Sequence, residues 1–244
     1  MTIAAAAFIF AGGFVAGVIN SIAGGGTLLS FPALIALGRD PLLANATNAV
    51  GLCTGSLASA FGLRAHVKEV KHRLPALLVL PLVGGIAGAA LLVLTPSDVF
   101  SRLYPYLILG ATVLFAAQDA IGRATSAPGM VAWPLLLGIG IYGGYFGAGI
   151  GILLLATLGI LGHRDIHEKN VLKNLIAAGI NGVAAVLFIW RGVVLWADAL
   201  LLGAGAIAGG YAGARLAQRL GRTFVRRAVV VIGAVLTVWA FTHR

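Results

Sequence analysis

NSIAGGGTLLSFP, residues 20–32, places three consecutive glycines, Gly24, Gly25 and Gly26, inside a long apolar run. Glycine is the least favourable ordinary residue for a helix interior, at about 1 kcal/mol per position. A chain surrounded by lipid must also pair its backbone N–H groups, because each unpaired group costs several kcal/mol. The stretch therefore predicts a helix break that serves a specific purpose, either ligand binding or close helix packing.

Composition indicates a membrane protein. Of the 244 residues, 60% are hydrophobic and only 10% are charged, whereas a soluble domain carries about 25% charged residues. The net charge of +10 comes from basic residues in short segments between apolar runs, which is the pattern of the positive-inside rule and not of a nucleic-acid-binding surface. Cys53 is the only cysteine, so no intrachain disulfide is predicted. We expect a single integral membrane domain in the cell (inner) membrane, with the lipid bilayer as a partner and no nucleic acid.

Apolar runs of about 20 residues can cross a bilayer as helices. Runs of this kind lie near residues 44–63, 75–95, 103–121, 171–190, 199–217 and 225–242. Two further apolar regions are interrupted by glycines: 3–37, at 24–26, and 130–162, in GAGIG at 147–151. The sequence therefore predicts an all-α polytopic membrane protein with two glycine-broken helix pairs.

The two halves of the chain align without a gap at an offset of 125 residues. Glycines, an Arg-Asp pair and an asparagine coincide in this alignment: Gly13 with Gly138, Gly24 with Gly149, Gly26 with Gly151, Arg39-Asp40 with Arg164-Asp165, and Asn45 with Asn170. The match predicts an internal duplication, with a first transmembrane repeat at 1–122 and a second at 126–244.

Loop charge predicts that the two repeats are inverted. The basic loops 64–73 and 218–227 are expected on the cytoplasmic side, and the weakly charged loops 96–101 and 192–197 outside. Loops at equivalent positions of the two halves then face opposite sides, so each half crosses the membrane an odd number of times. Each repeat is a glycine-broken pair followed by three spanning helices, with both termini outside. The alternative, eight helices in two parallel halves, would leave one basic loop on the wrong side.

Inverted repeats with broken helices are typical of transporters, which bind substrate near the bilayer midplane. If each broken pair enters from its own side, the short helices that start near Gly26 and Gly151 direct N–H groups at one point. A helix N-terminus carries about half a positive charge, which favours an anion. Close packing is the alternative interpretation of both breaks. It is our interpretation of the glycine pairs elsewhere in the chain, Gly84 with Gly88 and Gly209 with Gly213.

Small polar side chains complete the candidate site. Asn174 and Asn181 share a helix face, and polar residues inside a membrane usually face the bundle interior. Lys173 either binds the anion or extends to the membrane interface, and Asn45 and Asn170 are expected to cap helix starts. The predicted substrate-binding residues are Asn20, Ser21, Gly24, Gly25, Gly26, Thr27, Asn48, Tyr145, Gly147, Ala148, Gly149, Gly151, Asn174 and Asn181.

Other chemistry is not predicted. No span holds a nucleophile with its base or a pair of carboxylates, so the chain is not expected to be an enzyme. His163 and His167, with Asp165 and Glu168, have metal-like spacing, but we interpret them as a solvated polar connection. Neither a metal nor a cofactor is expected.

Three segments resemble the sulfite exporter TauE/SafE family: AGGGTLLSFPAL at 23–34, NATNAVG at 45–51 and GYFGAGIGILL at 144–154. The resemblance covers nearly the whole chain. It implies transport of sulfur-containing oxyanions or organosulfonates, such as sulfite, sulfoacetate or thiosulfate, often outward. The second glycine motif departs from the first, with Ile150 in place of the middle glycine and Thr157 in place of Pro32.

We therefore predict a secondary transporter, an exporter, that binds small sulfur-containing anions such as sulfite, thiosulfate or organosulfonates between the two glycine breaks. A homodimer is possible. A passive anion channel is the alternative function. A third possibility is a non-transporting membrane scaffold whose glycines only pack helices.

Overall fold

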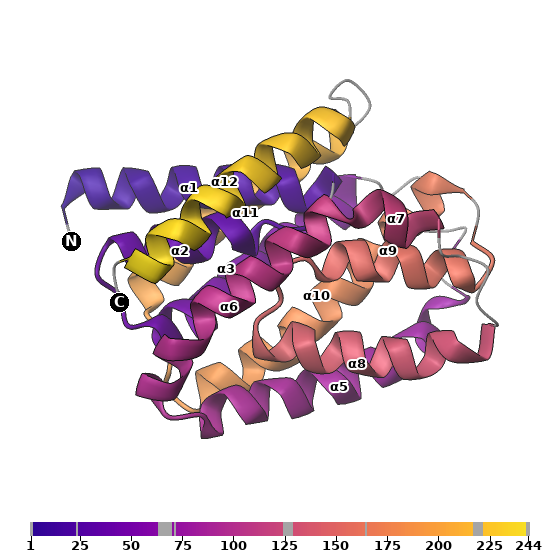
Figure 1. The fold of residues 1–244 in the computed structure, drawn as a ribbon, viewed down its shortest axis with the longest axis horizontal. Helices are drawn as coiled ribbons and strands as arrows, with labels where there is room; N and C mark the ends of the chain where they lie inside the picture. The colour runs from indigo at the N-terminus through magenta and orange to yellow at the C-terminus, as the bar shows by residue number, and fades with distance from the viewer. Residues whose placement is uncertain are drawn as a thin grey trace.

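The computed structural model is a helical bundle, in which residues 2–22, 24–62, 70, 72–123, 129–163, 165–216 and 222–242 are described (Figure 1). These residues contain helices and no β-strand. The all-α prediction is therefore confirmed. Within the predicted cytoplasmic loops 64–73 and 218–227, residues 64–69, 71 and 218–221 lie outside the described residues, and so does Arg164.

The predicted apolar runs form helices, with 103–121 divided between two helices at Ala117, and both interrupted regions are split at their glycines. The first half contains α1 (Ile3–Ile22), α2 (Thr27–Ala36), α3 (Pro41–Gly62), α5 (Leu74–Leu94), α6 (Ser97–Ala116) and α7 (Gln118–Arg123). The second half contains the short turn η1 (Gly129–Val131), α8 (Ala132–Tyr145), α9 (Ile150–Ile160), α10 (Ile166–Trp190), α11 (Trp196–Leu216) and α12 (Arg222–Thr242).

Aspartates start the two helices that follow the broken pairs. The N–H of Leu42 donates to Asp40 Oδ1 over 2.9 Å at the start of α3, and the N–H of Glu168 donates to Asp165 Oδ1 over 2.8 Å at the start of α10. Both bonds pair an N–H that has no acceptor within its helix. These helices consequently begin before the apolar runs do.

The prediction that Asn45 and Asn170 cap helix starts is wrong. Both lie inside helices, Asn45 in α3 and Asn170 in α10. The Asn45 amide instead donates to the carbonyl oxygen of Tyr145 over 2.8 Å, which ties α3 to the end of α8. Sequence reasoning placed the helix starts at the first apolar residues and so overlooked the aspartates as caps.

The described helices include four that are long and apolar enough to cross a membrane: α1, α5, α6 and α10, with mean hydropathy between 1.5 and 2.6. Large apolar side chains such as Val79, Val113 and Val231 are exposed on the outside of the bundle. Such exposure suits a surface that contacts lipid chains. The fold is that of a polytopic membrane protein.

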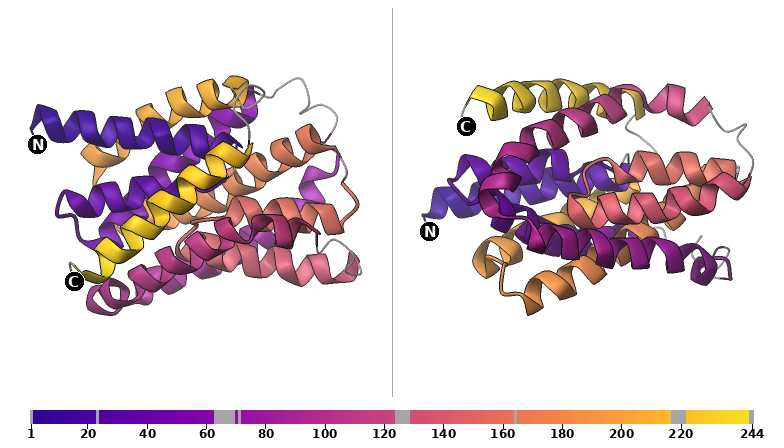
Figure 2. Two further views of the ribbon diagram at one scale, coloured as in Figure 1. Left: turned by 45° about the horizontal axis from the view of Figure 1, so that its top comes forward. Right: turned by 60° about the horizontal axis from the view of Figure 1, so that its bottom comes forward.

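The two broken pairs enter the bundle from opposite ends. In Figure 1, the pair α1–α2 comes from the left and the pair α8–α9 from the right. The start of α1 and the end of α12 lie at the same end of the bundle in all views (Figures 1 and 2). Each pair consists of a longer first helix and a short second helix that returns toward its own end.

Glycines let each broken pair pack closely against the other half. A Cβ at Gly84 or Gly88 of α5 would lie 2.4 or 2.0 Å from the carbonyl oxygens of Leu137 or Ile141 in α8. Between α11 and α1, a Cβ at Gly209 would lie 1.9 Å from the carbonyl oxygen of Phe14, and a Cβ at Gly213 would lie 2.7 Å from Val18 Cα. The packing interpretation of these four glycines is confirmed.

The same contacts show how the halves correspond. The α11 glycines follow the α5 glycines by 125 residues, but Leu137 and Ile141 follow their counterparts Phe14 and Val18 by 123 residues. The gapless offset of 125 therefore does not describe the contacts of α1 and α8. The second half has two more residues than the first between its break and the aspartate that starts the next helix.

Candidate functional site

The first break is a tight turn tied back to the end of α1. Gly24 has φ +78°, and its N–H donates to the carbonyl oxygen of Ile19 over 3.0 Å. This left-handed conformation ends a helix and favours glycine. The N–H of Gly26 donates to Asn20 Oδ1 over 2.9 Å, so the side chain of Asn20 spans the turn just before α2 begins at Thr27.

The second break repeats this geometry. Gly147 has φ +80°, and its N–H donates to the carbonyl oxygen of Tyr142 over 3.1 Å. Gly147 and Tyr142 follow Gly24 and Ile19 by 123 residues, the offset found in the packing of α1 and α8. The Tyr142 hydroxyl donates to the carbonyl oxygen of Ala148 over 2.7 Å, and α9 begins two residues later.

This correspondence changes the alignment of the two motifs. Gly24, Gly25 and Gly26 align with Gly147, Ala148 and Gly149, so that Ile150 aligns with Thr27. Ile150 therefore does not replace the middle glycine. The residue at the middle position is Ala148, so the second motif has two glycines where the first has three.

The two breaks touch each other at Gly24 and Gly151. A Cβ added to Gly24 would lie 2.5 Å from Gly151 Cα, and a Cβ added to Gly151 would lie 2.4 Å from Gly24 Cα. Real Cβ atoms do not approach backbone atoms this closely. Two backbones from the two halves of the chain can meet here only because both residues are glycine.

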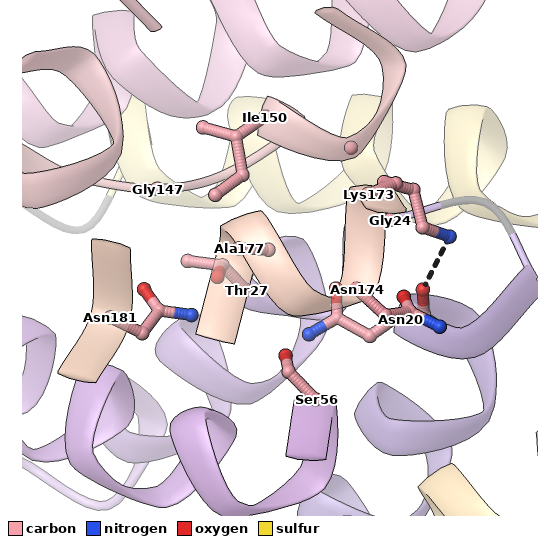
Figure 3. Close-up of a pocket in the computed structure, with 11 residues that line it drawn as sticks. Asn20, Gly24, Thr27, Ser56, Gly147, Ile150, Lys173, Asn174, Ala177 and Asn181 are labelled. Carbon is pink, nitrogen blue, oxygen red and sulfur yellow. Dashed lines mark hydrogen bonds between the residues drawn. The ribbon is translucent and has the colours of Figure 1, made fainter. Parts of the chain in front are cut away.

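A narrow cavity of about 10 Å³, with room for roughly one water molecule, lies beside this contact (Figure 3). Both broken pairs contribute to its wall, and α3 and α10 complete it. Its lining residues are Asn20, Gly24, Thr27, Ser56, Gly147, Ile150, Gly151, Lys173, Asn174, Ala177 and Asn181. No acidic side chain occurs among them.

Lys173 provides the positive charge of the cavity. The residue is only 1% exposed, and its Nζ donates to the carbonyl oxygens of Asn20 over 3.1 Å and of Ser21 over 3.2 Å (Figure 3). These carbonyls belong to the last turn of α1, where a cation interacts favourably with the helix dipole. The alternative in which Lys173 extends to the membrane interface is therefore wrong.

Asn174 carries a buried hydrogen-bond donor that is unpaired within the described residues. The residue is 3% exposed, and its Nδ2 has no hydrogen-bond partner. A buried unpaired donor lowers the stability of a protein by about 1–3 kcal/mol. A ligand that accepts a hydrogen bond from Asn174 would remove this cost. Figure 3 shows Asn174 with Ser56, Thr27 and Asn181 around the same space.

Half of the residues predicted from the sequence line this cavity, and half do not. Those that do are Asn20, Gly24, Thr27, Gly147, Gly151, Asn174 and Asn181. Those outside its lining are Ser21, Gly25, Gly26, Asn48, Tyr145, Ala148 and Gly149.

The glycines and the alanine outside the lining hold the turns in place. A Cβ at Gly25 would lie 1.9 Å from Cζ of Phe115, and a Cβ at Gly26 would lie 2.3 Å from the carbonyl oxygen of Ala16. Gly149 adopts φ +80° at the start of α9, and Ala148 accepts the bond from Tyr142. These residues fix the positions of the two turns, and other residues of the same turns line the cavity.

The polar residues outside the lining are engaged by neighbouring elements. Asn48 Oδ1 accepts a hydrogen bond from the Ser30 hydroxyl, which ties α3 to α2. The Tyr145 ring packs edge-on against Phe100, with 5.8 Å between ring centroids. Ser21 Oγ is buried and unpaired among the described residues, but the side chain lies against Gly213 rather than in the cavity lining.

Sequence reasoning missed Ser56, Ile150 and Ala177 and left Lys173 undecided. The spacing in α10 held part of the signal, because 173, 174, 177 and 181 fall on one helix face. Ser56 and Ile150 could not be found in this way, since they reach the cavity through the packing of α3 and α9 on α10.

The expected solvated connection before α10 is solvated only in part, because Asp165 is exposed but His163 is buried. His163 is only 7% exposed, and its Nδ1 lies 2.8 Å from Glu168 Oε1. Arg73, at the start of α5, donates to the same oxygen over 3.0 Å. At the opposite end of the bundle, Arg39 forms a two-point ion pair with buried Asp198, with distances of 2.7 and 3.2 Å. Each cluster joins the two halves of the chain.

Comparison with known proteins gives a consistent result. Residues 9–240 match the sulfite exporter TauE/SafE family. A probable membrane transporter protein, ORF9, of Sinorhizobium is 30% identical over 238 residues, which cover 95% of this chain and 90% of the relative. The probable membrane transporter protein YfcA of Escherichia coli is 30% identical over 227 residues, 91% of this chain and 84% of the relative. A probable membrane transporter protein of Haemophilus influenzae is 30% identical over 240 residues, 95% of this chain and 92% of the relative. No solved structure matches the chain.

These relatives and this family are membrane transporters and not enzymes, as the sequence predicted. The match extends from α1 to α12 and so includes both broken pairs and every wall of the cavity. This chain is a multi-pass transporter of the cell membrane and belongs to the sulfite exporter TauE/SafE family.

Proposed function

We propose that the chain is a secondary transporter that exports small sulfur-containing anions, such as sulfite, thiosulfate or organosulfonates, and binds them in the cavity between the two breaks. One observation carries the proposal: buried Lys173 and Asn174 line the same cavity, and no acidic residue is in its lining. The Nδ2 of Asn174 has no hydrogen-bond partner among the described residues. A cation beside an unsatisfied donor is a setting for an oxyanion.

The helix starts at the breaks support an anionic substrate. α2 begins at Thr27 and α9 at Ile150, and both residues line the cavity. The first N–H groups of any helix have no acceptor within it, and they attract negative charge. The cavity therefore places the Lys173 side chain together with the N–H groups of two helix starts.

Helix lengths support a position near the bilayer midplane. α2 has 10 residues and α9 has 11, which correspond to lengths of about 15 and 16 Å at a rise of 1.5 Å per residue. The hydrocarbon core is about 30 Å thick. A break that starts a helix of half this length, with the other end at the membrane surface, lies close to the centre.

Inverted repeats at 1–122 and 126–244 form part of the proposal. In support, the broken pairs enter from opposite ends (Figure 1), and the two breaks share one hydrogen-bond pattern. In transporters built this way, one repeat rocks against the other around a fixed site, which is thereby exposed to each side in turn.

The sulfur-containing substrate and the outward direction rest on the family's name, since the relatives are named only as membrane transporters. The chemistry of the cavity agrees with this class: sulfite and sulfonates present several oxygen acceptors on one small anionic group. Asn174 Nδ2 and the Lys173 ammonium are hydrogen-bond donors suited to such oxygens.

Counterflow of radiolabelled sulfite into proteoliposomes that contain the purified protein tests the function. Unlabelled sulfite inside should accelerate uptake of labelled sulfite, because a carrier exchanges faster than it moves substrate one way. Asn174→Leu should reduce this exchange by about 5- to 150-fold, since it removes a donor worth about 1–3 kcal/mol. Thr157→Val is the matched control, because Thr157 bonds only within α9 and lies outside the lining.

Two outcomes would overturn the proposal. Sulfite flux without acceleration by internal sulfite identifies a channel. If sulfite, thiosulfate and simple sulfonates produce neither flux nor a thermal shift, a sulfur anion is not the substrate, and a scaffold becomes the better description. A bound ligand raises stability by RT ln(1 + [L]/Kd), so high concentrations reveal even weak binding.

A further inference from the structure

We infer that this transporter moves as two bodies that do not coincide with its two repeats. The first body combines α1, α2 and α3 with α11, and the second combines α8, α9 and α10 with α5, so each takes one helix from the other repeat. The cavity lies between the bodies and opens when they separate. This division rests on the proposed function and deepens it, because it names the parts that move when the site is exposed to each side in turn.

The cavity is closed in this structure. Its volume of about 10 Å³ holds roughly one water molecule, whereas sulfite and sulfonates carry three oxygens on one sulfur. The two breaks also touch at Gly24 and Gly151, where no side chain can move aside. The walls of the cavity must therefore separate before such an anion can bind.

Glycines interlock α11 with α1 and α3 of the first repeat. A Cβ at Gly17 of α1 would lie 2.4 Å from the carbonyl oxygen of Ala206 in α11, and a Cβ at Gly210 of α11 would lie 2.5 Å from the carbonyl oxygen of Gly55 in α3. At these distances one backbone fills the space beside the other, as in small-residue packing within membranes. Sliding α11 past α1 or α3 would create collisions or voids, so the three helices move together.

The same packing joins α5 to the second repeat. A Cβ at Gly140 of α8 would lie 2.4 Å from the carbonyl oxygen of Pro81 in α5, and a Cβ at Gly144 would lie 2.1 Å from the carbonyl oxygen of Gly85. α5 also contacts α10, where a Cβ at Gly85 would lie 3.0 Å from Cγ2 of Val183. α5 is therefore the counterpart of α11, and each belongs by packing to the opposite repeat.

The ion pairs at the two ends of the bundle lie within these bodies. Arg39, in the link after α2, pairs with Asp198 of α11, and Arg73, at the start of α5, pairs with Glu168 of α10. Asp198 follows Arg73 by 125 residues, so the two helices contribute equivalent positions with opposite charge. If the repeats moved as wholes, both pairs would break, and the buried carboxylate of Asp198 would lose its partner at high cost. Movement of the mixed bodies keeps both pairs.

The helix contact between the bodies is looser. α3 meets α10 beside Cys53, and a Cβ at Gly182 would lie 3.7 Å from Cys53 Sγ, an ordinary contact distance. The residues that line the cavity belong to α1, α2, α3 and the first break on one side and to the second break, α9 and α10 on the other, and none belongs to α5 or α11. The cavity therefore follows the interface between the two bodies.

Side chains make the hydrogen bonds that cross this interface among the described residues. Lys173 donates to the carbonyl oxygens of Asn20 and Ser21, and the Asn45 amide donates to the carbonyl oxygen of Tyr145. A side chain can release such a bond by changing its rotamer, whereas interlocked glycine backbones have no such freedom. α6 and α12 pack on each other and belong to neither body.

A disulfide between α3 and α10 tests the inference. Gly182→Cys with native Cys53 joins these helices across the cavity interface, since a Cβ at 182 lies 3.7 Å from Cys53 Sγ, close enough for a disulfide to form. Sulfite counterflow by the oxidised protein in proteoliposomes should fall by more than about tenfold, because alternating access requires the bodies to separate, and a reductant should restore it. Oxidised Gly182→Cys in a Cys53→Ser background is the control and should keep its flux.

Two matched disulfides lie within the bodies. In a Cys53→Ser background, Thr54→Cys with Gly203→Cys links α3 to α11, and Gly85→Cys with Val183→Cys links α5 to α10. The added Cβ at 203 lies 3.3 Å from Thr54 Oγ1, and that at 85 lies 3.0 Å from Val183 Cγ2. Both disulfides should change counterflow by less than about twofold, because helices of one body do not move apart. They also join the two repeats, so all three disulfides would block exchange if the repeats moved as wholes.

The outcomes separate this inference from the proposed function. Exchange that survives the α3–α10 disulfide overturns the division into bodies, and so does exchange that either disulfide within a body blocks; sulfite exchange by the reduced protein leaves the transporter in place in both cases. If no sulfur anion exchanges, the proposed substrate is wrong, and an impermeant thiol reagent replaces flux as the measurement. Thr27→Cys, in the cavity wall, should then react from both sides of the membrane until the α3–α10 disulfide restricts reaction to one side. Reaction from both sides after that disulfide forms overturns the two bodies, and reaction from neither side in the reduced protein overturns both proposals.

Discussion

The two breaks end their helices in the same way but are tied by opposite chemistry. At the first, Asn20 accepts a hydrogen bond from the N–H of Gly26. At the second, Tyr142 donates a hydrogen bond to the carbonyl oxygen of Ala148. One break is thus held through a backbone donor and the other through a backbone acceptor, although each side chain lies near the end of the helix that precedes the turn.

The breaks also differ in why they need glycine. At the first, the space beside Gly25 and Gly26 is filled by the Phe115 ring and by the backbone of Ala16. At the second, Gly147 and Gly149 have positive φ with more space around them, and the middle position tolerates the methyl group of Ala148. Packing therefore limits Gly25 and Gly26 of the first break, whereas backbone conformation limits Gly147 and Gly149 of the second. Substitutions should therefore act differently at the two breaks.

The largest effect is expected where the breaks touch. Gly151→Ala would place a methyl group 2.4 Å from Gly24 Cα, with backbone on both sides and no side chain that could move away. Overpacking of a tight core costs about 1–3 kcal/mol and sometimes more, and we expect the upper end of this range. Thermal unfolding of the purified protein in detergent measures the loss.

Gly138→Ala is the control for that experiment. Gly138 lies in α8 with open space around its added Cβ, so the change should be neutral or stabilise by about 0.5–1 kcal/mol through helix propensity. Equal melting temperatures for Gly151→Ala and the unaltered protein would show that the two breaks do not meet as described.

The next effect separates packing from backbone conformation. Gly25→Ala collides with the Phe115 ring and should cost about 1–3 kcal/mol, and Phe115→Leu should restore part of this loss in the double variant. Gly147→Ala should cost about 1–2 kcal/mol through its positive φ, and Phe115→Leu should not relieve it. Double-mutant cycles on the free energy of unfolding test both statements. Additive energies for Gly25 and Phe115 would contradict the packing account of the first break.

The side-chain hydrogen bonds that hold the two breaks, made by Asn20 and Tyr142, should also differ in their contribution to stability. Asn20→Leu leaves the N–H of Gly26 unpaired and should destabilise by about 1–3 kcal/mol, whereas Tyr142→Phe should cost about 1 kcal/mol. Transport should fall more in Asn20→Leu, because Asn20 also lines the cavity. Asn20→Asp retains the acceptor and adds a negative charge, so it should keep stability and lose anion flux. Normal flux in Asn20→Asp would argue against an anion site at this position.

The last prediction concerns orientation and involves no change in stability. In a Cys53→Ser background, single cysteines at His72 and Arg227 should react with an impermeant reagent from the same side, and a cysteine at Arg191 from the opposite side. All three residues are exposed, and inverted repeats require this arrangement. Reaction of positions 72 and 227 from opposite sides would contradict the proposal that the two breaks enter from opposite faces of the membrane.

Local sequence signals predicted the elements well. The apolar runs and the glycine interruptions indicated the helices and both breaks, because helix length in a membrane and helix breaking by glycine are properties of short segments. The aspartate caps were readable in the same way at Asp40 and Asp165, but the search for caps began too far along the chain.

By itself, therefore, the sequence determined that this is a helical membrane protein broken at two glycine-rich points. Tertiary structure decided which residues meet there. Only packing between the halves could bring Gly24 onto Gly151, bury Lys173 against the carbonyls of Asn20 and Ser21, and fill the space beside Gly25 with Phe115. These contacts join residues at least 90 positions apart, and they depend on helix rotation and register, which hydrophobicity and glycine placement in one segment do not fix. The correspondence between the two breaks shows this most clearly. Many small apolar residues match at an offset of either 123 or 125 residues, and only the backbone hydrogen bonds of Gly24 and Gly147 favour 123 at the breaks.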